Sequence, residues 1–361
     1  MLKKAAAALL VCASVAMGMG CGTTKSRFVY AAIPASNEIV AFREDPNAGV
    51  LTQLAGSPIT AGLGVEALAL HPSKKFMYAA NSGQNNISLF TLSSTGGITE
   101  VTPRTNTGGT APTVMVMDAA GTYLYVGNAV SFDISVFSID SSTGALTPVP
   151  QASGPTAGIG MSPLNMQLSP SGNILYVTGQ AITGVVQAFQ VNGGVLSQQP
   201  VPGSPFTTGN NPYGLTIAPG GGFLYTANKL DNSISEFTIN ADGSLTPLPG
   251  SPLGETGTGP LALLIENSGK YLYVVNNQSP GNLLAYSIGG DGSLTLASNS
   301  QFSTGAQPSV IASDPSGKYL FVGNESSAAI QSLSLNTGSG ILTSVASYSV
   351  PGAPTAIVVT P

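Results

Sequence analysis

The amino-acid sequence predicts an all-β fold, a seven-bladed β-propeller built from four-stranded antiparallel blades. Two observations predict it: a strand motif with a central aromatic residue recurs along the whole chain, and three other strand-like segments recur between its copies. A third observation, the order of these segments at the two ends of the chain, predicts that the C-terminal strand completes the first blade.

The aromatic strand is the clearest repeated element, for example FMYAAN at residues 76–81 and YLYVGN at 123–128. Its central aromatic positions are Tyr30, Tyr78, Tyr125, Tyr176, Tyr225, Tyr273 and Phe321, and successive positions are 47 to 51 residues apart. Self-similarity at such a regular period is the signature of a repeat architecture. Seven copies therefore predict seven blades.

The other three elements supply the remaining strands of each blade. The segment DISVFSI at 133–139 alternates apolar and polar residues, as a half-buried strand does. A short G-x-L-T segment follows it at 144–147, and a strand that begins near a proline, such as 212–219, comes last. Four short strands with Gly and Pro punctuation and no helical period are typical of a propeller blade.

The chain enters the repeat at the aromatic strand near Phe28 and ends with a proline-led strand at residues 354–361. We therefore expect this last strand to pair with the first aromatic strand. Such closure removes the open sheet edge that would otherwise invite aggregation.

The N-terminus predicts export. Residues 1–20 read as a signal peptide, with Lys3 and Lys4 followed by an apolar run and small residues. The sequence before Cys21 resembles a bacterial lipobox, so we expect Cys21 to be lipidated as the first mature residue; simple cleavage or an uncleaved anchor are the alternatives. Residues 21–27 are then a short linker and 28–361 the propeller. The expected location is periplasmic or cell-surface, with membrane contact only through the lipid.

Composition excludes several classes of function. The net charge is −5 and charged residues make up only 7% of the chain, so no basic field exists to neutralise phosphates, and we expect no nucleic-acid partner. Cys12 and Cys21 both lie in the export segment, which leaves the propeller no disulfide. No His or Cys cluster, Asp-rich calcium loop or phosphate loop is present, so we expect no metal and no cofactor. We expect a monomer.

The repeat resembles the lactonase family of seven-bladed propellers, typified by 6-phosphogluconolactonase, in its pattern P-x-x-ϕ-x-ϕ-x-P-S-G-K-Y-L-Y-V-x-N followed by an I-S-V-F-type strand and G-x-L-T. The aromatic strand is also similar to that of YVTN-type surface propellers. The resemblance implies lactone hydrolysis in the central pore. Family enzymes commonly carry Arg and His where an inner strand starts, but the equivalent starts here are neutral, as at Pro112-Thr113 and Pro308-Ser309. No catalytic residue is therefore carried over.

Glu66 is the best single polar candidate for catalysis or ligand binding. It aligns with neutral residues in the other repeats, at the mouth where the inner strands are expected to begin, and an acid there can act as a general base or orient a hydroxyl. The alternative is a solvated strand end. His71, the one histidine, is expected to stabilise a turn, with a general base as the alternative.

Amide and phenol side chains form the remaining candidate ligand-binding set. They are Asn81, Asn128, Asn165, Tyr213, Asn228, Asn276 and Asn324. Five of these asparagines follow the aromatic strand, where a structural role in turns is the alternative to a ring of amides suited to hydroxyls.

Two functions remain open from the sequence. The first is a non-catalytic surface module that binds a glycan, small molecule or protein at the pore-mouth face, and the low charge and missing Arg and His favour it. The second is a lactone hydrolase of altered specificity acting in the pore. The first predicts a flat neutral rim, and the second predicts polar groups converging around Glu66.

Overall fold

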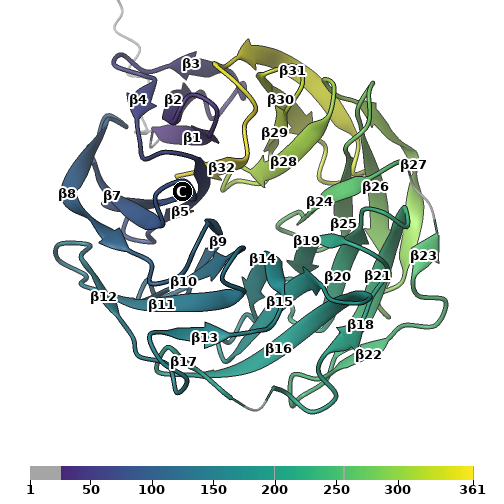
Figure 1. Cartoon of the computed structure of the whole chain (residues 1–361). Helices are drawn as coiled ribbons and strands as arrows, with labels where there is room; N and C mark the ends of the chain where they lie inside the picture. The colour runs from purple at the N-terminus through teal and green to yellow at the C-terminus, as the bar shows by residue number, and fades with distance from the viewer. Residues whose placement is uncertain (1–25, 199, 255–256, 361) are drawn as a thin grey trace, which may run out of the picture.

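The computed structural model describes residues 26–198, 200–254 and 257–360. Within these residues, seven antiparallel sheets stand as blades around a central axis (Figure 1). The predicted all-β, seven-bladed propeller is thus confirmed. The expected signal peptide and Cys21 lie outside the described residues.

In each blade the strands follow one another along the chain, with one exception: the C-terminal strand of the chain belongs to blade 1. Blade 1 contains β1 (Arg27–Ile33), β2 (Glu38–Glu44), β3 (Leu51–Gln53), β4 (Ile59–Thr60) and β32 (Ala356–Val359). Blade 2 contains β5 (Val65–Leu70), β6 (Phe76–Asn81), β7 (Asn86–Leu92) and β8 (Ile98–Asn106). Blade 3 contains β9 (Pro112–Met117), β10 (Tyr123–Asn128), β11 (Asp133–Ile139), β12 (Leu146–Pro148) and β13 (Thr156–Gly158). Blade 4 contains β14 (Ser162–Leu168), β15 (Ile174–Gln180), β16 (Gly184–Asn192), β17 (Val195–Leu196) and β18 (Phe206–Thr207).

The remaining three blades repeat this plan. Blade 5 contains β19 (Pro212–Ile217), β20 (Phe223–Asn228), β21 (Ser233–Ile239), β22 (Leu245–Pro247) and β23 (Leu253–Gly254). Blade 6 contains β24 (Pro260–Ile265), β25 (Tyr271–Asn276), β26 (Asn282–Ile288) and β27 (Leu294–Ser303). Blade 7 contains β28 (Pro308–Ser313), β29 (Tyr319–Asn324), β30 (Ala329–Leu335) and β31 (Leu342–Ser349).

The proline-led strand is the innermost strand of each blade, and the G-x-L-T segment is the outermost. In blades 1, 3, 4 and 5 the outer edge consists of two short strands that pair with opposite ends of the third strand, whereas blades 2, 6 and 7 have one longer strand there.

The aromatic strand is the most conspicuous repeat in the sequence because it is buried on both faces. All six residues of β6 are buried, as are all six of β29. Blades stack face to face, so a second strand has a neighbouring blade on each side and reads as a nearly continuous apolar run rather than an alternating one. The buried clusters accordingly combine residues of adjacent blades, as Tyr30 of blade 1 does with Met77 of blade 2.

The ring closes as the sequence predicted. Strand β32 pairs antiparallel with β1, and Val29 lies opposite Val359 and Ala32 opposite Ala356. Figure 1 shows the C-terminal strand in yellow beside the purple first strand. Blade 1 is therefore built from both ends of the chain. Because β32 pairs with β1, the inner edge of β1 is not left open.

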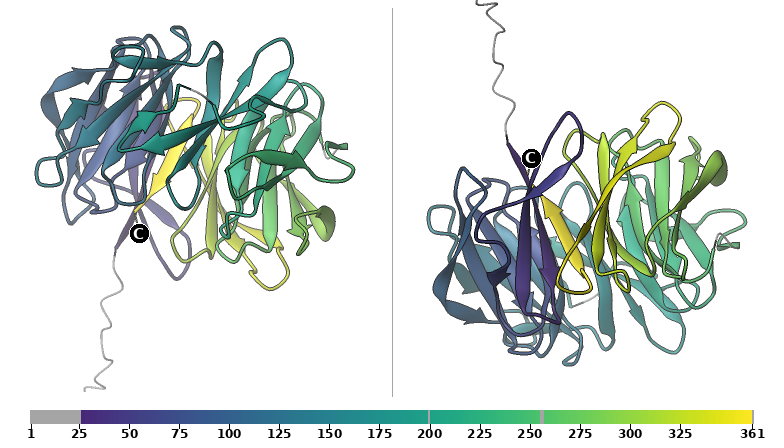
Figure 2. Two further views of the ribbon diagram at one scale, coloured as in Figure 1. Left: turned by 90° about the horizontal axis from the view of Figure 1, so that it is seen from below. Right: turned by 90° about the horizontal axis from the view of Figure 1, so that it is seen from above.

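The two faces of the ring differ in what they carry. The inner strands begin on one face, here called the mouth face, and β1 begins on the other, where Arg27 contacts Asp314 and Ser316 in a turn that follows an inner strand. The edge-on views show the purple strand β1 beginning at this opposite face (Figure 2).

Candidate functional site

A β-bulge occurs at the start of six inner strands, on the mouth face. In blade 2, Val65 pairs with Asn81 and Ala67 with Ala80, so Glu66 is an extra residue without a partner in the ladder. The equivalent extra residues are Thr113, Leu164, Tyr213, Leu261 and Ser309. A bulge redirects a side chain away from the regular alternation and is common beside active sites. This repeated bulge gathers one side chain from each of these blades at the pore.

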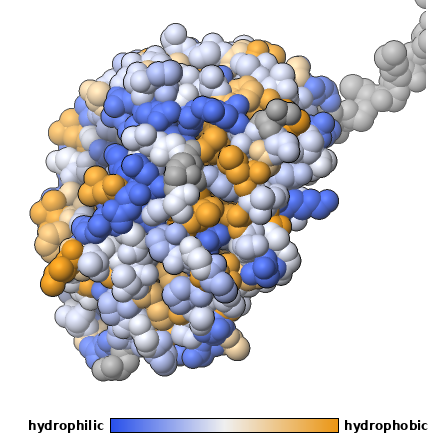
Figure 3. Space-filling model, turned by 90° about the vertical axis from the view of Figure 1, so that its right-hand side faces the viewer, coloured by the Kyte–Doolittle hydropathy of each residue, from blue (hydrophilic) through white to orange (hydrophobic). Residues whose placement is uncertain are grey.

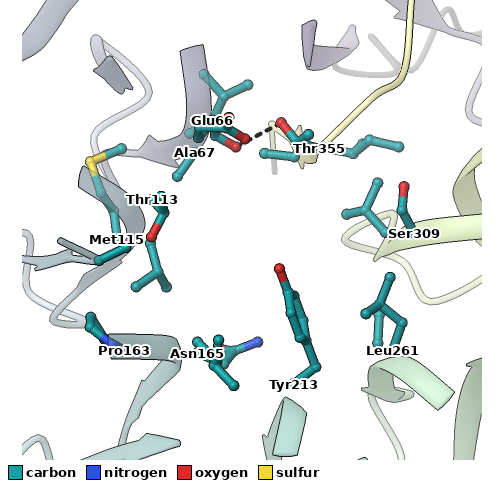
Figure 4. A pocket seen from close by; sticks show the side chains of 18 of the residues that line it. Glu66, Ala67, Thr113, Met115, Pro163, Asn165, Tyr213, Leu261, Ser309 and Thr355 are labelled. Carbon is teal, nitrogen blue, oxygen red and sulfur yellow. Dashed lines mark hydrogen bonds between the residues drawn. The ribbon is translucent and has the colours of Figure 1, made fainter. Parts of the chain in front are cut away.

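These side chains surround a cavity of about 660 Å³ at the mouth of the central channel. Thr355, which directly precedes β32, supplies the position of blade 1. Figure 4 shows Glu66 and Thr355 on one side of the cavity, and Tyr213 with its hydroxyl directed into it from the other side. Apolar side chains also line the cavity: Leu68, Met115, Leu263, Ile311 and Ile357.

Several of the polar groups that line the cavity already have protein partners. The hydroxyl of Thr355 donates to the backbone carbonyl of Glu66 at 2.8 Å, which ties blade 1 to blade 2. The hydroxyl of Ser309 donates to the carbonyl of Pro354 at 2.9 Å, and the side-chain oxygen of Asn165 accepts from the amide of Met166. Among the described residues, no side-chain hydrogen bond to the protein is seen for the Glu66 carboxylate, the Thr113 and Tyr213 hydroxyls or the Asn165 NH₂ group.

Glu66 is the single acidic residue among those that line the cavity, and no Lys, Arg or His lines it within the described chain. Its partial burial removes water from the carboxylate and raises the pKa of Glu66. Burial also raises the pKa of Tyr213, with smaller contributions from the negative charges of Glu66 and Glu325. The ammonium group of Lys229 lies 5.5 Å from the centre of the Tyr213 ring, on the outer side of the mouth.

The structure places the candidate residues in two groups. Glu66, Asn165 and Tyr213 line the cavity together. Asn81, Asn128, Asn228, Asn276 and Asn324 are buried at the ends of the second strands and do not line it. Their amides bond inside their own blades: Asn128, for example, donates to Asp133 at 2.8 Å and to Ser135 at 2.8 Å.

A glycine packs against each of these five buried amides. A Cβ atom on Gly62 would lie 2.2 Å from the Asn81 side chain, and Gly109, Gly209, Gly257 and Gly305 hold the corresponding place beside the other four. The amides are thus covered by the loop that leads into the inner strand of their own blade, which keeps them from the pore.

His71 lies at the other end of its inner strand from Glu66. Its Nδ1 accepts from the backbone amide of Ser73 at 3.0 Å, so the proton sits on Nε2, which donates to the carbonyl of Gly121 in the next blade at 3.0 Å. Both ring nitrogens are therefore used in holding a turn on the face opposite the mouth.

Sequence reasoning did not nominate Thr113, Ser309 or Thr355, which share the cavity with Glu66. The signal was present, because all three occupy the Glu66 position of their own repeats, one residue after the proline in each case. In the sequence alone, a neutral hydroxyl at this position of the repeat looks like an ordinary exposed strand residue. Only the bulge shows that the residues at this position face the pore.

No group of three or more His, Cys, Asp or Glu residues in the described part of the chain could hold a metal ion. Over the same residues, no helix is long and apolar enough to span a membrane.

The fold is a seven-bladed propeller with a cavity at the mouth of its central channel. The chain belongs to the lactonase family of seven-bladed β-propellers, whose family model matches residues 23–159 and 167–359. A comparison with curated proteins gives no significant match.

Solved structures with the same fold include proteins from several bacteria. A Bacteroides fragilis protein provisionally called a 6-phosphogluconolactonase is 19% identical with a TM-score of 0.80, over 94% of this chain and 99% of that one. The periplasmic gluconolactonase PpgL of Pseudomonas aeruginosa is 20% identical with a TM-score of 0.73, over 93% of this chain and 99% of that one. At this identity, the likeness shows a shared fold.

Proposed function

We propose that this protein hydrolyses an uncharged lactone in the cavity at the mouth of its channel. The observation that carries the proposal is a lone, half-buried carboxylate, Glu66, whose pKa is raised and which faces hydrogen-bond donors across a cavity of about 660 Å³. A perturbed ionisable group in a concave site identifies a candidate catalytic residue. A flat neutral rim, which a surface-binding module would have, does not fit this cavity.

The chemistry needs only a base and donors. The Glu66 carboxylate accepts a proton from a water molecule as the water oxygen bonds to the lactone carbonyl carbon. The Tyr213 hydroxyl and the Asn165 NH₂ group are the available donors for the negative charge that develops on the carbonyl oxygen. The ring C–O bond then breaks, and the proton returns from Glu66 to the departing ring oxygen, which gives the open hydroxy acid.

The absence of Lys, Arg and His from the lining of the described cavity favours an unphosphorylated substrate. A phosphate group would bring about two negative charges close to Glu66, and no cation among the described lining residues would pair with them. The proposed substrate therefore differs from the phosphorylated lactone that the name 6-phosphogluconolactonase implies.

We also propose that the protein works outside the cytoplasm, held to a membrane through a lipid on Cys21. Arg27, the first strand residue, lies on the face opposite the mouth. A tether that enters the ring there leaves the mouth directed away from the membrane and open to solutes.

The test is lactone hydrolysis by the purified protein, followed by pH-stat over aldonolactones and simple γ- and δ-lactones. We expect saturable turnover that Glu66→Gln abolishes. Glu325→Gln removes an exposed acid on the same face and serves as the matched control. Rates equal to buffer over the whole panel would overturn the proposal, and binding of the lactones without turnover would assign the cavity to a binding protein instead.

A further inference from the structure

The mouth face carries exposed apolar side chains on one side only. Loops of blades 2 to 5 present an apolar arc, which consists of Leu63, Val130, Phe132, Ile182 and Leu230, with exposed fractions of 51, 62, 47, 99 and 68%. The turns between the second and third strands of blades 6, 7 and 1 carry polar residues such as Gln278, Ser326 and Ser36. The same turn of blade 2 is also polar, and Leu63 lies instead in the loop before β5. The space-filling view shows the side of blades 5 and 6, where hydrophobic side chains are visible at the left edge, which is the edge of the mouth face, and also elsewhere on this side (Figure 3).

Phe132 departs from the residue choice of three other blades at an equivalent turn position. It adopts a left-handed backbone conformation, with φ of 59°, where blades 1, 2 and 5 place Asn37, Asn85 and Asn232. Asparagine tolerates that conformation, whereas a bulky aromatic residue rarely adopts it.

The asparagines at this turn position also bond to the next blade. Asn37 accepts from the amide of Gly64, Asn85 from that of Ala111 and Asn232 from that of Gly259. In blade 3, Phe132 has no side-chain oxygen to accept this bond. Its exposed phenyl ring is attached to a backbone in the unfavourable left-handed conformation. Residues that violate local rules without a structural gain are expected at functional sites.

Three residues of the apolar arc lie close in the sequence to residues at the cavity. Val130 follows Ala129, which lines the cavity, and Leu63 precedes Glu66 by three residues. Leu230 follows Lys229, whose ammonium group lies against the Tyr213 ring. A ligand whose reacting group lies beside Glu66 and Tyr213 would therefore meet an apolar surface on one side of the cavity opening and a polar surface on the other side.

Some of the polar groups in the cavity already bond to the protein: the Thr355 and Ser309 hydroxyls donate their hydrogens to backbone carbonyls, and the Asn165 oxygen accepts from an amide. A sugar lactone carries several hydroxyls, and each buried hydroxyl without a partner costs free energy. A ligand with one polar ring and an aliphatic chain suits these surroundings better.

We infer that the substrate is a lactone with a medium-length alkyl substituent, whose ring enters the cavity beside Glu66 and whose chain lies across the apolar arc. The inference rests on the proposed function and names the substrate class of that same site. It makes the arc the surface that sets specificity, while the reaction itself is left to Glu66.

The experiment measures hydrolysis of δ-lactones that differ only in alkyl chain length, from δ-valerolactone to δ-dodecalactone, with glucono-δ-lactone for comparison. We expect KM to fall about twofold for each added methylene, since a partly buried methylene gains about half the transfer free energy of a fully buried one. The double variant Ile182→Ser/Leu230→Ser should lose this dependence on chain length. The matched control, Val50→Ser/Ile341→Ser, removes two exposed apolar residues from the opposite face and should keep it.

The outcomes separate the inference from the proposed function. Turnover with the same KM at every chain length would overturn the inference and leave the hydrolase standing. If no lactone is hydrolysed, the proposed function fails, and calorimetry with non-hydrolysable 6-alkyl δ-lactams then decides: binding that tightens with chain length and depends on the arc supports the inference, and chain-independent binding overturns it. Sedimentation with phosphatidylcholine vesicles that the double variant abolishes would also overturn it, by assigning the arc to a lipid surface.

Discussion

The phenol of Tyr30 in blade 1 donates a hydrogen bond of 2.8 Å to the backbone carbonyl of Gly96 in blade 2. The same bond links further pairs of neighbouring blades: Tyr78 to Gly144, Tyr176 to Gly243, Tyr225 to Gly292 and Tyr273 to Gly340. Four of these glycines are the first residue of a G-x-L-T segment, and Gly96 begins the variant G-x-I-T. The two most regular features of the repeat are therefore partners across the blade interface.

The glycine itself is explained by the same contact. Gly96 has a φ of 85°, and a Cβ atom there would lie 2.2 Å from the ring of Phe28, in the aromatic strand of the preceding blade. The phenols are deeply buried, and burial raises the pKa of Tyr176, for example, to about 12. They therefore stay protonated, as a donor must.

Removal of one such phenol should destabilise the ring. In Tyr225→Phe the carbonyl of Gly292 stays buried without its partner, which costs about 1–3 kcal/mol of the free energy of unfolding. Urea denaturation followed by circular dichroism measures the change. Tyr213→Phe, which removes a phenol from the cavity rather than from a blade interface, is the control, and equal losses in both variants would argue against the interblade role.

Blade 7 lacks the phenol, because Phe321 occupies that position. Ser332, which pairs with Phe321 across the sheet, instead donates to the carbonyl of Gly49 in blade 1 at 2.6 Å. We predict that Ser332→Ala lowers the free energy of unfolding about as much as Tyr225→Phe does. Ser334→Ala, two residues along the same strand, removes a more exposed hydroxyl and should change it by less than about 0.5 kcal/mol. A thermal melt of both variants checks the contrast, which would disappear if Ser332 merely filled space.

The seam between blades 1 and 7 should make stability depend on pH. Glu44 is buried there, 3.6 Å from Arg27, which pairs more closely with Asp314 at 2.5 Å. Burial and the charge of Asp314 raise the pKa of Glu44 to about 7, with Asp45 adding to the effect and Arg27 opposing it.

A pKa raised in the fold means that the folded state favours the protonated carboxyl. This contribution to stability is fully present below the ordinary pKa of about 4.5 and is lost as the pH rises through 7. We expect the free energy of unfolding to fall by roughly 1–3 kcal/mol from pH 5 to pH 8 in the wild type and to stay flatter in Glu44→Gln. Urea titrations at several pH values measure it, with Glu325→Gln as the exposed control. Parallel pH curves for wild type and Glu44→Gln would show that Glu44 does not cause the dependence.

The repeat made the fold predictable because each blade buries the same positions. The spacing of Tyr30 and its equivalents gave the number of blades, and the proline-led segment at the C-terminus gave the closure that β32 makes with β1. These features follow from local patterns and from the avoidance of an open edge, which a single sequence displays directly.

The site was only partly predictable, because bulges and burial are tertiary features. Alignment of the repeats placed Glu66 and Tyr213 at the mouth. Only the register of the strand pairing shows that the residues at this position of the repeats face the pore. The repeated asparagines at the ends of the second strands looked equally regular. Nothing in the sequence revealed that Gly62 and its equivalents cover the amides of those asparagines. A repeated polar residue can serve either the blade or the ligand, and packing decides between them.

The rate of lactone hydrolysis should report the state of Glu66. A general base must be ionised, and partial burial raises the pKa of Glu66 above its ordinary value of 4.5. We expect kcat/KM to rise with pH through an inflection above 4.5 and then to level off. Glu66→Asp should keep a pH-dependent but slower reaction, because the shorter side chain holds the carboxylate farther from the water it must deprotonate. The measurement is a pH–rate profile with a neutral lactone, corrected for spontaneous hydrolysis. A profile in Glu66→Gln with the wild-type inflection would assign the base to another residue of the cavity.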